Sequence, residues 1–472
     1  LPSSNKAPDH EVAFPARPWN HFWMRKIILA LLACVSCLLL SATPPERLAI
    51  VDISAAGPSN LNILKKLGGI AWWTEIGGSL IVSANARGFI NMDRTGFVAK
   101  ALPDLTTTDQ LRVLVAGHSS VELPAGINVL ADEGRARLVE GDSAALAALD
   151  QLAPDKPATV GVFPVVPGRV ILKSPVNLER PQRMSSRDAT LVNEVARKVS
   201  KDRWWADVQK LASWNRHISA AGNVSARDWI KSSLAAIPGM EVTLQEFRVS
   251  GRSSWNVVGI LPGERMVYES GSASTNDRGL VIVGGHFDST SERPSSAAPG
   301  AEDNASGAAG VVEIARVMAE VPHSEDIVFV AFSGEEQGLY GSAAFVEELP
   351  DGEKSRVRGV VTMDMVAYSR AGASGPLGVL IETESAHSDF ARRFVEAAAE
   401  VTKLRVTTSF NPFGSDHVSF LEAGLPAILA IDADWNRYAH YHKTTDTPDK
   451  LTPELAHEIL KMNAAVTALL AR

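Results

Sequence analysis

Residues 280–288 read Leu-Val-Ile-Val-Gly-Gly-His-Phe-Asp, an apolar run that ends in two glycines, a histidine and an aspartate. Further apolar runs of strand length follow, and stretches with helical spacing separate them. Because these runs are apolar throughout rather than alternating, they predict a largely parallel α/β sheet covered on both faces. The expected strands are 280–283, 327–332, 357–363 and 427–431, and the expected helices include 307–320, 389–401 and 453–470. Upstream, Ser225 is expected to cap a helix that carries Trp229.

Ligands of an open α/β sheet gather at the carboxyl ends of its strands, so these positions decide the chemistry. The first run leads into His286 and Asp288, and the second into the Glu335-Glu336 pair. The third leads directly into Asp364. The remaining candidates are Asp303, which precedes the helix 307–320, and His440 and His442, which lie in the loop after the fourth run.

Imidazole and carboxylate groups without a thiolate are typical of a catalytic rather than a structural zinc site. Two zinc ions, each with one histidine and one terminal carboxylate and both sharing a bridging carboxylate, would use five of these groups. Such a pair holds a water for attack on a carbonyl carbon. The remaining glutamate would take the proton of the water and pass it to the leaving amine. Asp288 is placed to hold the second nitrogen of His286.

Each of these motifs alone has an ordinary structural explanation. A Glu-Glu pair after a strand is most often solvated, and a single loop histidine is more often structural than a ligand. The joint pattern favours a site, because adjacent carboxylates between apolar segments are costly to bury without a cation. The competing candidates are Asp416-His417 and His440, and His440 is the alternative ligand to His442.

The motifs together resemble the co-catalytic zinc peptidase family, which includes bacterial leucyl aminopeptidases and glutamate carboxypeptidase II, with the glutaminyl cyclases as relatives. The resemblance runs from about residue 190 to the C-terminus. It is carried by Gly-Gly-His286-Phe-Asp288-Ser, Pro-Gly-Ala-Glu-Asp303-Asn-Ala-Ser-Gly, Gly-Glu335-Glu336-Gln-Gly-Leu-Tyr-Gly-Ser, Met363-Asp364-Met365, Ser415-Asp416-His417 and Tyr441-His442-Lys-Thr-Thr-Asp446-Thr.

The resemblance implies a phosphorylase/hydrolase-like fold, a three-layer α/β/α sandwich, that holds two Zn²⁺ per chain. His286 and Asp364 would bind one zinc ion, Glu336 and His442 the other, and Asp303 would bridge them. Glu335 would be the general base and acid, with Asp288 beside it in the catalytic set. A cis peptide bond is implied after the bridging aspartate, between Asp303 and Asn304.

The sequence departs from some leucyl aminopeptidases just before Ser415-Asp416-His417. Those enzymes carry a tyrosine and a cysteine pair there, whereas this chain has Asn411-Pro412-Phe413-Gly414, so that oxyanion helper and disulfide are not expected. Tyr441 or a main-chain N–H group remains as the candidate that would stabilise the oxyanion. Two interpretations remain for the aromatic residues Phe410, Phe413 and Tyr438. They could line an apolar pocket for the substrate side chain, or their rings could simply pack in the core or at its rim.

An export signal is predicted at residues 24–43. It has a basic start at Arg25-Lys26, an apolar stretch over 27–40 and small residues before Pro44, and the stretch is too short for a comfortable membrane span. We expect the mature chain to be periplasmic or extracellular, without a stable membrane span. Both cysteines lie inside the signal, and acylation of Cys34 in a lipoprotein-type box is the minor alternative. Residues 1–23 are expected to reflect a start codon assigned too early.

Length suggests two domains after the signal. Residues 44–172 combine short β-type runs with short helices, which predicts a smaller α+β domain, either a pro-domain or a permanent accessory domain. Residues 173–187 form the expected linker, and 188–472 the catalytic domain. The net charge of −8 argues against a nucleic-acid partner.

The expected function is zinc-dependent removal of the N-terminal residue of peptide substrates. A carboxypeptidase-type exopeptidase with the same ligands is the first alternative. A glutaminyl cyclase-like acyltransferase with one zinc is the second, although it would not need both His286 and Asp364. A receptor-like relative without metals is disfavoured, because all five ligands and Glu335 are present.

Overall fold

The computed structural model describes most of the chain after residue 45. The described residues are 46–53, 58–102, 107–116, 123–132, 136–151, 160–168, 170–172, 176–178, 183–249, 251–264, 278–412 and 414–472. The export signal predicted at 24–43 and Phe413 therefore lie outside the described residues. Among the described helices, none combines the length and the apolar character needed to cross a bilayer.

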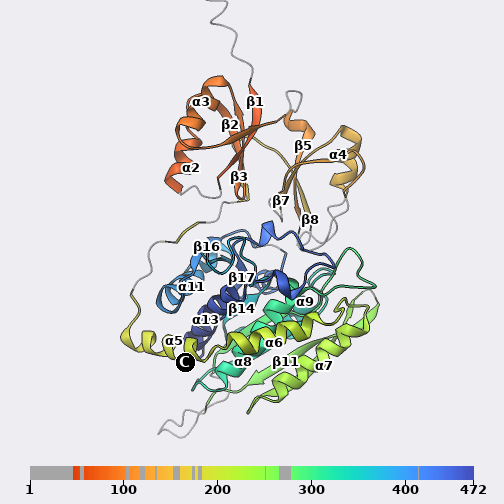
Figure 1. The fold of residues 1–472 in the computed structure, drawn as a ribbon, viewed down its shortest axis with the longest axis vertical. Coiled ribbons are helices and arrows are strands. Elements are labelled where there is room, and N and C mark those ends of the chain that lie inside the picture. The colour runs from red at the N-terminus through yellow and green to blue at the C-terminus, as the bar shows by residue number, and fades with distance from the viewer. Residues whose placement is uncertain are drawn as a thin grey trace, which may run out of the picture. The chain divides into compact units, whose positions relative to one another are not determined.

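The first part of the described chain contains two small sheets with helices beside them (Figure 1). A five-stranded sheet has the order β4-β1-β3-β2-β9, and a four-stranded sheet has the order β6-β7-β5-β8. One apolar cluster contains residues of both sheets, among them Ile81 and Val113. The elements are β1 (Arg47–Asp52), α2 (Pro58–Leu64), β2 (Ile70–Ile76), β3 (Ser79–Ala84), α3 (Ala86–Arg94), β4 (Ala99–Ala101), β5 (Leu111–Ala116), β6 (Asn128–Asp132), β7 (Ala136–Glu140), α4 (Ser143–Asp150), β8 (Val160–Pro164) and β9 (Val170–Leu172).

An eight-stranded sheet forms the centre of the second part, in the order β10-β11-β13-β12-β14-β17-β15-β16. The four central strands β13, β12, β14 and β17 are parallel. Antiparallel pairs join β11 to β13, β10 to β11 and β15 to β17. The strands are β10 (Glu241–Val249), β11 (Arg252–Leu261), β12 (Leu280–His286), β13 (Asp326–Phe332), β14 (Val357–Met363), β15 (Gly378–Glu382), β16 (Arg405–Ser409) and β17 (Ala427–Asp432).

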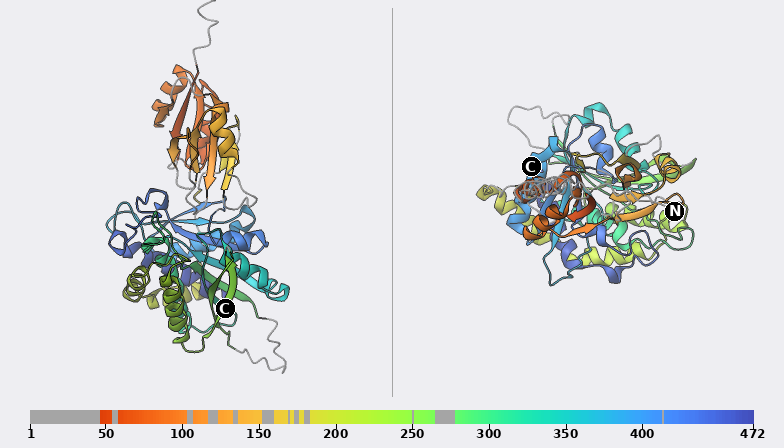
Figure 2. Two further views of the ribbon diagram at one scale, coloured as in Figure 1. Left: turned by 90° about the vertical axis from the view of Figure 1, so that its right-hand side faces the viewer. Right: turned by 90° about the horizontal axis from the view of Figure 1, so that it is seen from above.

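Helices cover both faces of this sheet, which makes the second part a three-layer α/β/α sandwich (Figures 1 and 2). On one face the helices pack over a large apolar cluster, and on the other α9 and α12 pack over a second one. The helices of the first face are α5 (Ser186–Lys198), α6 (Lys201–Ala212), α7 (Ala221–Ala235), α8 (Gly307–Met318), α11 (Ser388–Val401) and α13 (Pro453–Leu470). The second face has α9 (Tyr340–Glu348) and α12 (His417–Glu422), and a short helix, α10, covers Asp351–Lys354.

The predicted α/β class is confirmed, and the central strands explain why the sequence predicted it. All seven residues of β12 and of β13 are buried, as expected for strands covered on both faces. The antiparallel edge pairs were not predicted. The strand β10 alternates between exposed and less exposed residues, which is typical of an edge strand with one face in solvent.

Two local predictions were wrong. The helix α7 begins at Ala221, four residues before Ser225, and it has no side-chain cap. The Ser225 hydroxyl instead donates to the carbonyl oxygen of Ala221, the bond that a serine inside a helix makes. The strand β12 also runs on through the two glycines, so that His286 is its last residue rather than part of the following loop.

Candidate metal centre

The candidate ligands come together at the carboxyl ends of the central parallel strands. His286 ends β12, Glu335 and Glu336 follow β13, and Asp364 directly follows β14. The other two come from connecting segments, Asp303 from the turn Ala301–Ser306 before α8 and His442 from the loop after β17. Neighbouring parallel strands end at the same edge of a sheet, and side chains far apart in the sequence therefore meet.

Asp303 lies between two groups of side chains. Its Oδ1 is 3.4 Å from Nε2 of His286, and its Oδ2 is 3.1 Å from Nε2 of His442. The same His286 nitrogen is 3.3 Å from Oδ1 of Asp364, and the same His442 nitrogen is 3.1 Å from Oε2 of Glu336. Each oxygen of Asp303 thus faces a different pair of one histidine and one carboxylate.

These carboxylates are buried without the hydrogen bonds that buried carboxylates normally receive. No described N–H or O–H group donates to either oxygen of Asp303 or of Glu336. Ligand atoms of His286, Asp303 and Glu336 lie within 4.8 Å of one another, and so do those of His286, Glu335 and Asp364. Imidazole and carboxylate donors at this spacing fit divalent zinc, with Asp303 able to serve two ions.

The protonation of the centre indicates an excess of negative charge in the absence of a cation. Burial raises the pKa of Glu336 to about 7, against the opposing effect of His442. Burial alone would lower the pKa of His442, but Glu336 and Asp303 together raise it to about 10. Burial also raises the pKa of Glu335 well above its ordinary value. In the absence of metal ions, bound protons therefore reduce the negative charge of this cluster. Metal binding would displace these protons.

Asp288 lies between His286 and the glutamate pair. Its Oδ1 is 3.6 Å from Nδ1 of His286, and its main-chain carbonyl oxygen is 3.2 Å from the same nitrogen. Its two carboxylate oxygens accept the main-chain N–H groups of Glu335 and Glu336, each at 3.3 Å. Asp288 is therefore placed to orient three functional side chains.

The backbone around the centre has several uncommon conformations. The peptide bond between Asp303 and Asn304 is cis, as the resemblance implies. His442 has φ 53° and Met365, next to Asp364, has φ 50°. A positive φ is uncommon for residues other than glycine, and such residues cluster at functional sites.

The competing candidates from the sequence do not join the ligand group. Nδ1 of His440 is 2.8 Å from the Thr445 hydroxyl oxygen, and His417 lies against Glu382 at 3.4 Å. Asp416 is buried, and burial raises its pKa to about 7. The Ser415 hydroxyl donates to Oδ2 of Asp364 at 2.8 Å, so this motif contacts a candidate ligand through its serine.

Two residues to which the sequence assigned no role support the backbone of the centre. Arg216 is fully buried, and its guanidinium donates to the carbonyl oxygens of Phe287 and Gly300, each at 2.7 Å. The side chain of Asn304 donates to the carbonyl oxygen of Met363 and accepts the N–H of Gly307. Arg216 lies outside every motif, and Asn304 lies inside the motif around Asp303, but the contacts of both depend on main-chain groups that the sequence pattern does not place.

Residues 256–467 match the profile of Peptidase family M28. This part of the chain belongs to peptidase family M28. The match begins within β11 and ends within α13, and it contains all five candidate ligands together with Glu335.

Curated relatives of the M28 domain are named as zinc metalloproteases and aminopeptidases. A probable zinc metalloprotease of Pyrenophora tritici-repentis is 31% identical over 288 residues, which are 51% of this chain and 59% of the relative. Aminopeptidase YwaD of Bacillus subtilis is 32% identical over 194 residues, which are 41% of this chain and 39% of the relative. The chain thus spans less than two thirds of the length of either protein.

Solved structures support the fold of the M28 domain. The LapA aminopeptidase of Legionella pneumophila aligns with a TM-score of 0.52 at 19% identity, covering 76% of this chain and 98% of its own. LapB of the same organism aligns with a TM-score of 0.52 at 18% identity, and the alignment covers 76% of this chain and 99% of LapB. At this identity the two structures bear on the architecture alone.

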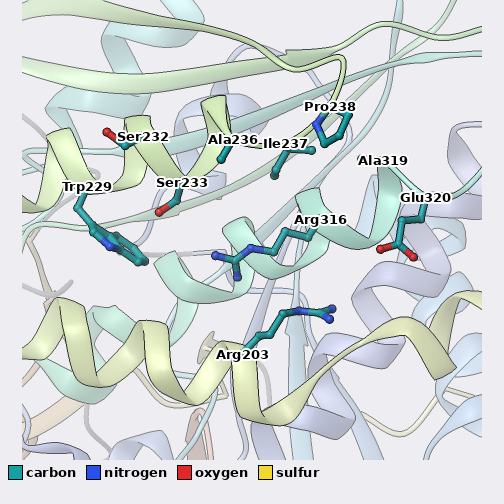
Figure 3. A pocket seen from close by; sticks show the side chains of 10 residues that line it. All are labelled: Arg203, Trp229, Ser232, Ser233, Ala236, Ile237, Pro238, Arg316, Ala319 and Glu320. Carbon is teal, nitrogen blue, oxygen red and sulfur yellow. The ribbon is translucent and has the colours of Figure 1, made fainter.

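A separate pocket of about 650 Å³ lies beside α6, α7 and α8 (Figure 3). Its two arginines are already engaged, because Arg203 donates to both carboxylate oxygens of Glu313 and Arg316 donates to Asp207. No candidate ligand of the metal centre is among its lining residues, which are Arg203, Trp229, Ser232, Ser233, Ala236, Ile237, Pro238, Arg316, Ala319 and Glu320.

Proposed function

We propose that this protein is an exported exopeptidase that binds two zinc ions and removes the N-terminal residue of peptides. The observation that carries the proposal is the position of Asp303, whose two oxygens face two separate pairs of a histidine and a carboxylate. His286 and Asp364 would hold one zinc ion, and Glu336 and His442 the other. The names of the relatives add support for zinc and for attack at the amino end.

When bound, the zinc ions would polarise the scissile carbonyl group and lower the pKa of a water molecule, so that the water loses a proton more readily and attacks the carbonyl carbon. Glu335 would act as the general base and then as the general acid. Its carboxylate is buried beside His286, at 4.0 Å from the imidazole nitrogen, and it is not needed as a ligand in this arrangement. It would take one proton from the water and deliver it to the nitrogen of the leaving amine.

Without a bound cation, the surroundings of Glu335 act on its pKa in both directions. Burial and the neighbouring carboxylate of Asp364 favour the protonated form, whereas His286 favours the charged form. A carboxylate held in this environment accepts a proton more readily than an exposed one. Asp288 would keep the base in place through the main-chain N–H of Glu335.

The deciding experiment measures bound metal and cleavage specificity together, on protein that begins near residue 44. We expect two zinc ions per chain and hydrolysis of a leucine anilide that is abolished by N-acetylation of the substrate and by a chelator. Added zinc should restore the activity of the chelated protein. Hydrolysis of only acetylated or C-terminally free substrates would instead support the carboxypeptidase alternative.

Other outcomes bear on the remaining alternatives. One tightly bound zinc ion and cyclisation of an N-terminal glutamine would support the glutaminyl cyclase alternative. Folded protein that takes up no zinc from solution would contradict the enzymatic proposal as a whole.

Export is tested separately. We expect expression of the gene in a bacterial host to yield a periplasmic or extracellular protein whose N-terminus, found by sequencing, lies close to residue 44. A cytoplasmic product that retains residues 24–43 would contradict the predicted signal.

A further inference from the structure

We propose that Asp446, fixed by Tyr438, is the positioning residue that aims the bridging carboxylate of Asp303 at both metal ions. The inference rests on the proposed function and adds to it a residue that is neither a ligand nor the base. Asp446 follows His442 by four positions, and it is buried.

Asp446 accepts hydrogen bonds from three consecutive main-chain N–H groups, those of residues 301 to 303. The N–H of Ala301 donates to its main-chain carbonyl oxygen at 3.1 Å. The N–H of Glu302 donates to Oδ1 at 2.9 Å, and the N–H of Asp303 donates to Oδ2 at 3.1 Å. Both oxygens of the Asp446 side chain are thus used on the segment that carries Asp303.

The Asp446 carboxylate is itself held in one orientation. The hydroxyl group of Tyr438 donates to Oδ1 of Asp446 at 2.6 Å. The Tyr438 side chain is 4% exposed and packs with Met365, Leu380 and Leu429. Of the two interpretations of this tyrosine, a ring lining a substrate pocket or a packed ring, the second is therefore correct.

Among the described groups, the oxygens of the Asp303 carboxylate face the imidazole nitrogens of His286 and His442, at 3.4 Å and 3.1 Å. No other described N–H or O–H group donates to them, so the direction of the carboxylate depends on the backbone that carries it. Gly300, just before the segment, has φ 49°, and a Cβ atom added there would lie 2.3 Å from the carbonyl oxygen of Asp303. Arg216 holds the preceding carbonyl groups of Pro299 and Gly300. Hydrogen bonds from Arg216 on one side and to Asp446 on the other therefore fix the backbone from which Asp303 projects.

Loss of such support is expected to weaken both zinc sites, because Asp303 belongs to both. Residues that orient metal ligands typically contribute a factor of about 10–100 to metal affinity or activity. The substitution Asp446→Asn would leave one acceptor oxygen and would turn an N–H₂ group toward one of the two main-chain N–H groups. The change is close to isosteric, so it tests the hydrogen bonds rather than the packing.

The test compares Asp446→Asn and Tyr438→Phe with the wild-type chain, and uses Asp449→Asn as the matched control. Asp449 lies three residues further along and bonds only to Thr447 and Lys450 among the partners found in the described part of the chain. Zinc affinity is measured by competition with a chromophoric chelator, and the ligand geometry by the visible spectrum of the cobalt-substituted protein. Far-ultraviolet circular dichroism and urea unfolding show whether each variant is folded.

We expect Asp446→Asn to lower zinc affinity about 10–100-fold, to alter the cobalt spectrum and to lower kcat more than it raises KM. Tyr438→Phe should shift all three in the same direction by a smaller factor, and Asp449→Asn should match the wild type. A folded Asp446→Asn variant with wild-type zinc affinity and cobalt spectrum would overturn the inference alone. If Asp446→Asn does not fold, unchanged affinity and spectrum in Tyr438→Phe would overturn it. A wild-type chain that binds no zinc would overturn the proposed function as well.

Discussion

Glu335 is distinguished from its neighbour Glu336 by what each side chain faces. Glu336 lies 3.1 Å from His442, whereas Glu335 lies at 4.0 Å from His286 and outside the two pairs that Asp303 faces. Replacing Glu335 by glutamine should therefore leave zinc binding and stability largely intact, while kcat falls by a factor of about 10²–10⁴ because the proton acceptor is lost. Steady-state kinetics with a leucine anilide and zinc analysis of the same sample check both halves of this prediction.

The matched control for that experiment is Glu336→Gln. Because Glu336 is a proposed ligand, its replacement should reduce the zinc content as well as kcat. Near-normal turnover in Glu335→Gln would show that the base lies elsewhere. Equal loss of zinc in the two variants would contradict the separate roles.

Glu302 and Asp432 form a second buried pair of acids beside the centre. Glu302 accepts the N–H groups of Ala367 and Tyr368 with one oxygen, and its second oxygen meets no described donor. Burial and the charge of Glu302 raise the pKa of Asp432 well above its ordinary value, and we infer that the two acids share a proton. Burial, reinforced by Asp446, raises the pKa of Glu302 from 4.5 to about 8. Between these two values the folded chain holds a proton that the unfolded chain has lost, so this pair makes stability fall as pH rises from about 4.5 to 8.

Asp432→Asn tests this pair, because the amide supplies a permanent donor in place of the shared proton. Above the pKa of Glu302 in the folded chain, the wild-type pair has lost its stabilising proton. The variant keeps the hydrogen bond from the introduced amide to Glu302. We expect the decrease in the free energy of unfolding between about pH 5 and pH 8.5 to be smaller in Asp432→Asn than in the wild type. Urea titrations of the metal-free proteins measure it, with the fully exposed Asp351→Asn as a control that should follow the wild type. An equal decrease in all three proteins would contradict the shared proton.

The candidate ligands could be predicted from the sequence because binding sites of an α/β sheet lie at the carboxyl ends of its strands. His286, Glu336 and Asp364 each follow or end a buried strand, so their meeting follows from the topology. The contacts of Arg216 and Tyr438 could not be predicted. They depend on carbonyl and carboxylate groups elsewhere in the sequence, whose positions only the folded backbone defines.

At the scale of elements, the short helix α12 takes part in an aromatic cluster with β13 and α9. Phe420 is fully buried, and its ring centroid lies 6.1 Å from that of Phe332 on β13 and 6.0 Å from that of Phe345 on α9. Phe420→Ala would remove the side chain that joins the two helices to the sheet. We expect the free energy of unfolding to fall by about 3–5 kcal/mol, as for other buried phenylalanines.

Urea unfolding of Phe420→Ala and of Val224→Ala gives the comparison. Val224 lies on α7 and is 42% exposed, so its truncation should change stability by no more than about 0.5 kcal/mol. A Phe420→Ala variant as stable as the Val224→Ala variant would mean that α12 contributes little to this face of the sheet.

Helices and strands were predicted more accurately where the segment is buried than where it is exposed. The helix 453–470 and the strand 357–363 were predicted to the residue. The helix begins at a proline, and both segments are largely buried. The strands β10 and β15 were missed. β10 is an antiparallel edge strand in which most residues are exposed or half-buried, so its sequence carries a weaker apolar signal. β15 is only five residues long, so its apolar run is short.

At the scale of the whole molecule, the apolar cores divide between Val165 and Leu178, and Leu178 and Met184 of the expected linker 173–187 pack against the large second core. Three clusters of buried residues use only positions up to Val165, and three use only positions from Leu178 onward. Within the described residues no cluster takes members from both sides. Each side therefore has its own core, which is the condition for independent folding.

We therefore expect residues 174–472 to fold and bind zinc without the first domain. This boundary retains Val176, which pairs with Thr408 of β16, and Leu178, which packs against the large core. The chain from residue 44 should show two urea transitions, and the fragment one of them. Circular dichroism, intrinsic fluorescence and zinc content of both proteins measure this.

The same pair of proteins tests whether the first domain is a pro-domain. As a pro-domain that blocks the zinc centre, it should hold kcat/KM of the intact chain below that of the fragment, and limited proteolysis near 173–187 should raise it. Equal kcat/KM in the two proteins would identify a permanent accessory domain, since its removal then changes nothing at the zinc centre. A fragment that folds only when the first domain is supplied in trans would contradict independent folding but would support a role for that domain in assisting folding.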